Sequence, residues 1–134
     1  MAALGGFSLA RRLAAGETVY TGWCALPAPI VAETIAREGF NTVTIDQQHG
    51  LWGTEATVNA VLAIRAAGAA PVVRVPLGAF AVASRSLDFG AEGIIAPMIN
   101  TVVDAKGVKQ SDQQIRTTMI SLMEEAIAQI KAGK

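Results

Sequence analysis

Short β-branched runs alternate with alanine-rich segments of helical spacing from residue 8 to residue 105. The runs at 18–25, 42–46, 71–75 and 93–98 predict four strands, because Val, Ile and Thr are enriched in strands. Between them, apolar residues spaced three or four apart and followed by glycine predict helices. This βα alternation predicts an α/β fold with a parallel sheet.

Helix boundaries are marked by capping and terminating residues. Ser8 is a predicted N-cap for a helix that ends before Gly16, and Pro29 lies at the start of a helix that ends at Gly39. Two more helices are predicted to end at Gly68 and Gly90.

The last part of the chain has a different character. Residues 106–114 are polar, and residues 111–131 have the apolar periodicity of an amphipathic helix. Such a helix can pack on its own sheet or exchange with a neighbouring subunit. We therefore predict a βα unit at residues 1–105, followed by a polar linker and an amphipathic helix at residues 106–134.

Composition narrows the function classes. The 134 residues are 51% hydrophobic with a formal net charge of zero, which predicts one folded domain and gives no basic surface for nucleic acid. No run approaches the roughly 20 apolar residues that span a bilayer, so neither a membrane protein nor a secreted one is expected. The single cysteine, Cys24, excludes an internal disulfide and favours a cytoplasmic protein.

Polar residues at the predicted strand ends are the candidates for chemistry, because ligands of parallel α/β sheets bind at the carboxyl edge. The second strand ends at Asp46, with His49, the chain's one histidine, three residues later. An aspartate that accepts a ring N–H makes a histidine more basic, which is the arrangement of a general base. A loop histidine that only caps backbone groups is the alternative.

Arg74 lies in the apolar third strand, where a guanidinium needs an anionic partner. That partner is either a bound carboxylate or, in the alternative, an internal ion pair with Asp46. Trp23 and Trp52 either wall a pocket or pack in the core. Phosphate-loop, zinc-protease, serine-hydrolase and EF-hand motifs are missing from the sequence, which leaves acid–base or carbonyl chemistry.

Five segments together resemble the HpcH/HpaI aldolases, a family of metal-dependent enzymes that use pyruvate. The resemblance covers about residues 5–105 and ends there. The segments are GWCALPAP at 22–29, AREGFN at 36–41, IDQQHG at 45–50, VRVP at 73–76 and LDFGAEGIIAPM at 87–98.

The resemblance implies a (β/α)8 TIM-barrel scaffold, a divalent Mg²⁺ or Mn²⁺ ion, and reversible cleavage of 2-oxo-4-hydroxy acids to pyruvate and an aldehyde. His49 matches the catalytic base, Asp46 the carboxylate that orients it, and Arg74 the arginine that binds pyruvate; Trp23 is a second candidate for substrate binding. The acidic metal ligands of the family lie in later Glu- and Asp-containing segments that this sequence lacks, so the metal ligands are unknown.

Four strands make about half of a barrel, and a half-barrel leaves two sheet edges open. Self-association is therefore expected, either as two facing half-barrels or as an open three-layer sheet. Three functions fit: an aldolase-type lyase, a catalytically inactive truncated or engineered half-barrel scaffold that self-associates, and a protein that binds small carboxylates without turnover.

Overall fold

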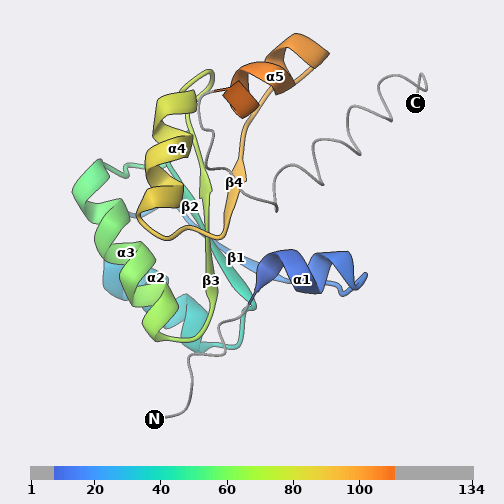
Figure 1. Cartoon of the computed structure of the whole chain (residues 1–134). Helices are drawn as coiled ribbons and strands as arrows, with labels where there is room; N and C mark the ends of the chain where they lie inside the picture. Colours follow the sequence, from blue (N-terminus) through green and yellow to red (C-terminus); the bar gives the residue numbers. More distant parts are fainter. Residues whose placement is uncertain (1–7, 111–134) are drawn as a thin grey trace.

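The computed structural model describes residues 8–110, and of residues 107–110 it describes only the backbone. Helices and strands alternate along this part of the chain (Figure 1). The elements are α1 (Leu9–Ala14), β1 (Thr21–Cys24), α2 (Pro29–Arg37), β2 (Thr42–Asp46), α3 (Thr54–Ala66), β3 (Ala70–Arg74), α4 (Phe80–Asp88), β4 (Gly93–Ile95) and α5 (Val102–Gln110).

The four strands form one parallel sheet in the order β1-β2-β3-β4. Each strand is therefore paired with the next strand in sequence, which is the strand order of a (β/α)8 barrel. The register places Trp23 opposite Thr44 and Asp46 opposite Arg74. The predicted α/β fold with four parallel strands is confirmed.

The main core lies between the sheet and helices α2, α3 and α4, which cover one face of the sheet (Figure 1). Val43, Ile45 and Val73 are fully buried on this face. Close helix packing depends on Gly22, where an added Cβ would overlap the Ile35 side chain of α2. Alternate strand residues, including Asp46 and Arg74, lie on the opposite face.

Helix α1 lies on that opposite side of the sheet (Figure 1). The Ser8 hydroxyl accepts a hydrogen bond from the Arg11 backbone N–H, so the predicted N-cap is confirmed. Leu9 packs on Ala70 and Val72 of β3, and its backbone N–H donates to Glu92 Oε2 at 3.0 Å. These contacts attach α1 to the amino end of β3 and β4.

Two strands are shorter than predicted. β1 begins at Thr21 because its partner β2 begins at Thr42, so residues 18–20 have no strand to pair with. β4 ends at Ile95, because Pro97 lacks an N–H and Met98 adopts a left-handed conformation with φ 57°. The carboxyl end of β4 is therefore a loop.

Helix α5 crosses residue 106, where the sequence predicted a polar linker. Its start is capped reciprocally, because Asp104 Oδ2 accepts the Thr101 N–H at 2.9 Å and Thr101 Oγ1 accepts the Asp104 N–H at 3.1 Å. The linker prediction is wrong up to Gln110. The predicted amphipathic helix at 111–131 lies outside the described residues, and the division at residue 105 stays a prediction.

Within residues 8–110, the longest helix is far too short to cross a membrane, and no helix combines the necessary length and apolar character.

Candidate active site at the carboxyl edge of the sheet

Three of the predicted site residues meet at the carboxyl edge of the sheet. Asp46 ends β2, Arg74 ends β3, and Trp23 is the next-to-last residue of β1. Asp46 shares a face with Thr44, two residues earlier in β2, and Thr44 pairs with Trp23. Arg74 pairs with Asp46, so all three side chains lie on the face opposite α2, α3 and α4. The parallel register makes Asp46 and Arg74 direct neighbours.

The Asp46 carboxylate accepts five hydrogen bonds. Oδ1 accepts from Arg74 Nε at 2.8 Å and from the backbone N–H groups of Gln48 and His49 at 3.0 and 3.1 Å. Oδ2 accepts from Arg74 Nη2 at 2.5 Å and from the Trp23 indole Nε1 at 3.1 Å. With 3% of its surface exposed, Asp46 is a buried carboxylate whose lone pairs are fully used.

This environment favours the ionised carboxylate. The hydrogen bonds from the Arg74 guanidinium lower the pKa of Asp46 far below its usual range, and they outweigh the opposing effect of burial. The same pair raises the pKa of Arg74. Asp46 is consequently a fixed negative charge and not a proton donor at neutral pH.

Arg74 forms the internal ion pair that the sequence left as one of two alternatives. Only its side edge, Nε and Nη2, contacts Asp46. Within the described residues, Nη1 and the outer N–H of Nη2 make no hydrogen bond to protein. The guanidinium carbon also lies 4.9 Å from the centre of the Trp23 ring. We call Nη1 and the outer N–H of Nη2 the end edge of the guanidinium. With its side chain 21% exposed, Arg74 can offer this end edge to a planar anion.

His49 is exposed in the loop between β2 and α3. Asp46 binds its backbone N–H, and the five hydrogen bonds of that carboxylate include none from the imidazole ring. The structure therefore differs from the predicted arrangement, in which Asp46 orients the ring. Arg74 and Trp23 occupy the carboxylate oxygens that such a bond would need. Asp46 instead fixes the position of the loop that carries His49.

The turn after β2 is held by backbone contacts. The Gly50 N–H donates to the Asp46 carbonyl at 3.0 Å, and the Leu51 N–H donates to the Ala25 carbonyl at 3.1 Å. At Gly50 an added Cβ would lie against both carbonyl oxygens, so the turn needs glycine. Trp52 is buried and donates its indole N–H to the Cys24 carbonyl, which makes it a packing residue.

Sequence reasoning missed Gln48. Its side-chain Oε1 accepts the Leu77 backbone N–H at 2.7 Å and so joins the β2–α3 loop to the β3–α4 loop. The adjacent Gln47 donates through Nε2 to Thr57 Oγ1 of α3 at 2.8 Å. The only sequence signal for the role of these two glutamines was their position directly after Asp46. That position matches no known motif, so it did not predict the contacts.

The described residues do not fit a divalent metal. Between residues 8 and 106, no three side chains of His, Cys, Asp or Glu come together as a ligand cluster. Asp46, the carboxylate nearest the site, already accepts five hydrogen bonds. The chemistry that these residues can supply is therefore that of their own side chains.

A hollow of about 420 Å³ lies at the amino ends of α2 and α3. Glu55 is its only ionisable lining residue, and neither His49 nor Arg74 contributes to it. It therefore lacks a pair of ionisable groups that could act together as acid and base. Its lining residues are Pro29, Gly53, Thr54, Glu55, Ala56 and Asn59.

Parallel strands in consecutive order, with ionic residues at their carboxyl ends, define a scaffold of the (β/α)8-barrel class. The chain belongs to the HpcH/HpaI aldolase/citrate lyase family, whose model matches residues 20–128. The predicted family is thus confirmed, and the match continues past residue 105, where the resemblance was predicted to end.

Curated relatives include a hydroxypyruvate/pyruvate aldolase of Rhizorhabdus wittichii, 37% identical over 91 residues, which are 68% of this chain and 36% of that protein. A 5-keto-4-deoxy-D-glucarate aldolase of Salmonella paratyphi A is 30% identical over 93 residues, which are 69% of this chain and 36% of that protein. The chain therefore spans little more than a third of these relatives.

Two solved structures show the same fold. The citrate synthase SbnG superimposes with a TM-score of 0.74 at 28% identity, over 90% of this chain and 51% of that one. An HpcH/HpaI aldolase/citrate lyase family protein of Burkholderia cenocepacia gives a TM-score of 0.71 at 33% identity, over 78% of this chain and 42% of that one.

Proposed function

We propose that this chain carries the pyruvate-binding part of an aldolase-type lyase, which reversibly cleaves 2-oxo-4-hydroxy acids to pyruvate and an aldehyde. The observation that carries the proposal is the end edge of Arg74, which faces away from Asp46 at the carboxyl edge of the sheet. A guanidinium held in this way matches the two adjacent oxygens of a 2-oxo acid. The family and its aldolase relatives support the reaction class.

In the cleavage direction, His49 is proposed to take the proton of the C4 hydroxyl. The C4–O bond becomes the carbonyl of the aldehyde as the C3–C4 bond breaks. The electron pair of that bond moves to C3 and the C2 oxygen, and this gives the enolate of pyruvate. Arg74 stabilises the negative charge on the enolate oxygen, and protonation at C3 then yields pyruvate.

Asp46 and Trp23 are proposed to position Arg74. Asp46 fixes the side edge of the guanidinium with two hydrogen bonds, and the Trp23 ring lies beside the guanidinium plane. Since both groups are in place before substrate binds, little side-chain entropy is lost on binding. Mg²⁺ or Mn²⁺, which the family implies, would supply Lewis-acid polarisation of the 2-oxo group when bound, and no residue between 8 and 106 is assigned to hold it.

The test is hydrogen–deuterium exchange at the methyl group of pyruvate in D₂O, measured by NMR with added Mn²⁺ or Mg²⁺ and with chelator. Enolisation of pyruvate is the half-reaction that does not require the aldehyde. We expect exchange in the wild-type chain, loss of exchange with retained pyruvate binding in His49→Gln, and loss of binding in Arg74→Lys. Arg85→Lys, on α4, is the matched control and should exchange normally.

A second candidate function is a non-catalytic scaffold that self-associates. It is favoured by the lack of a metal-ligand cluster in residues 8–106 and by the unpaired outer edges of β1 and β4 in the described sheet. Pyruvate binding without exchange at any metal concentration would support a carboxylate-binding scaffold. Sedimentation velocity over a hundredfold range of concentration would show whether a homo-oligomer forms.

A further inference from the structure

Each of the four loops that follow a strand exposes one large apolar side chain. These loops are residues 25–28, 47–53, 75–79 and 96–101. They surround the carboxyl edge at which Asp46 and Arg74 lie. We name the four side chains the apolar rim, and they are 58 to 76% exposed: Leu26, Leu51, Leu77 and Met98.

The rim is held in place by contacts between the loops. Two of these bonds start at rim residues, because the Leu51 N–H donates to the Ala25 carbonyl and the Leu77 N–H donates to Gln48 Oε1. Met98 has φ 57°, which is uncommon for a residue other than glycine. The backbone of Leu51 and of Leu77 is therefore held by a bond to another loop.

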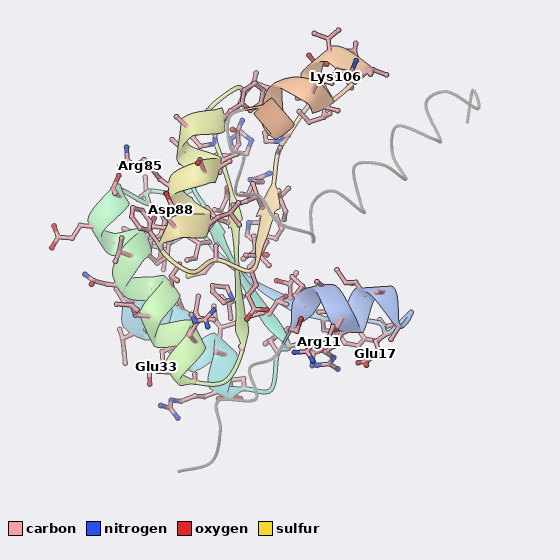
Figure 2. All side chains as sticks on the ribbon, viewed as in Figure 1. Arg11, Glu17, Glu33, Arg85, Asp88 and Lys106 are labelled. Carbon is pink, nitrogen blue, oxygen red and sulfur yellow. The ribbon has the colours of Figure 1, made fainter. Side chains whose placement is uncertain are left out.

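The four loops contain no Asp, Glu, Lys or Arg. Loops at the opposite, amino edge of the sheet do carry charge, since Glu17, Glu38 and Glu92 lie there. The first arginine or lysine that follows each rim loop in sequence belongs to a helix, and Arg85 on α4 and Lys106 on α5 are two of them (Figure 2). Arg74 is consequently the one arginine or lysine at these strand ends and in these loops, and His49 in the loop at 47–53 is their one histidine.

We propose that the apolar rim selects the second substrate, and that this substrate is an aldehyde with an uncharged, apolar chain. The inference rests on the proposed function, in which Arg74 binds the single carboxylate of the 2-oxo acid. A second carboxylate or a phosphate at the rim would lose water without gaining an arginine or lysine partner, which is costly. An alkyl chain would instead bury apolar surface against Leu51 and Leu77.

The test compares three 2-oxo acids by NMR titration of the chain: pyruvate, 2-oxopentanoate and 2-oxoglutarate. The last two have five carbons and differ in whether the chain ends in a methyl group or a carboxylate. Their carbons 4 and 5 occupy the place of the aldehyde carbons in the aldol product. We expect 2-oxopentanoate to bind severalfold more tightly than pyruvate, and 2-oxoglutarate to bind more weakly than pyruvate.

Replacement of rim residues should remove this preference. Leu51→Asn and Leu77→Asn are expected to bring 2-oxopentanoate to the affinity of pyruvate, with pyruvate binding unchanged. Leu62→Asn is the matched control, because Leu62 is an exposed leucine on the outer helix α3, and it should behave as the wild type.

Three results would contradict the proposal. Binding of 2-oxoglutarate as tight as that of 2-oxopentanoate would refute the selection. Loss of self-association in Leu51→Asn with unchanged selectivity would make the rim an interface between copies of the chain. If pyruvate itself does not bind, or binds equally to Arg74→Lys, the proposed function fails at its first step and the inference fails with it.

Discussion

The guanidinium carbon of Arg74 lies 4.9 Å from the ring centre of Trp23, while the indole N–H of Trp23 donates to the carboxylate that holds Arg74. Trp23 thus restrains the arginine in two ways, through a cation–π contact and through Asp46. Without this restraint, the end edge of the guanidinium could turn away from the direction in which a ligand approaches.

Replacement of Trp23 separates these two contacts. Trp23→Phe keeps an aromatic ring beside Arg74 but loses the N–H, whereas Trp23→Leu loses both. A cation–π contact at a half-exposed site contributes roughly 0.5–1 kcal/mol, so we expect pyruvate affinity to fall about two- to fivefold further in Trp23→Leu than in Trp23→Phe. Isothermal titration with pyruvate measures this, with Tyr20→Leu as the control for loss of an exposed aromatic ring. Wild-type affinity in Trp23→Leu would contradict the positioning role.

Acid should weaken the protein through Asp46. The folded pKa of Asp46 is lowered by Arg74, whereas in the unfolded chain it is about 3.9. The ionised carboxylate therefore stabilises the fold fully above about pH 4, and this stabilisation is lost as pH falls through the depressed folded pKa.

We expect Asp46→Asn to be less stable than the wild type at pH 7, and the difference to shrink as pH falls below about 4. Urea unfolding of both proteins between about pH 2 and pH 7 measures it. Asp104 also has a lowered pKa, owing to hydrogen bonds from Thr101. Because Asp104 is present in both proteins, its contribution cancels in the difference between their free energies of unfolding. A difference that stays constant over the whole range would refute the linkage.

Gly50→Ala should disturb the turn that carries His49, because the new methyl group would contact the carbonyl oxygens of Asp46 and Ala25. Overpacking of this kind destabilises by about 1–3 kcal/mol. Gly53→Ala, in the same loop, meets nothing within 4 Å and should lose at most about 1 kcal/mol of helix capping. Thermal unfolding compares the two variants, and equal melting temperatures would contradict the close approach at Gly50.

The cap of α5 predicts a local loss of stability in Thr101→Ala. Loss of the side-chain oxygen that accepts the Asp104 N–H should destabilise the helix by about 1 kcal/mol. Faster amide exchange confined to α5 is the expected readout. Thr34→Ala is the control, since the Thr34 hydroxyl bonds back to the Ile30 carbonyl within α2 and caps no helix end. Unchanged exchange in α5 would show that the cap is not stabilising.

Strand β2 was predicted to the residue, because its polar and glycine-rich neighbours mark both ends and its residues favour extended structure. Helix α5 was missed, although Thr101 and Asp104 have the spacing of a capping box. Lys106 and Gly107, which follow the capping residues, made the segment look like a linker, because glycine is a poor helix former. Capping and tertiary packing outweighed propensity there.

The sequence placed Asp46, His49 and Arg74 at the carboxyl edge of the sheet, where the structure has them, because parallel strands present their carboxyl ends together. The sequence left two side-chain partners open for Asp46, the His49 ring and Arg74, and did not decide between them. That choice depends on the register of β2 with β3, which makes Arg74 its neighbour, and on Trp23 reaching across from β1. Asp46 keeps a hydrogen bond from the His49 backbone N–H, but the side chains bonded to it are Arg74 and Trp23, both more than twenty residues away, and not the His49 ring.

The consecutive strand order also has a consequence for how the chain folds. Every strand pair closes a loop that contains one helix, so the pairing of β3 with β4 does not wait for β1. Topologies dominated by such local closures fold faster than those with distant pairings. We therefore expect successive βα units to add to a growing sheet, and the chain to gain structure in the order in which it is synthesised.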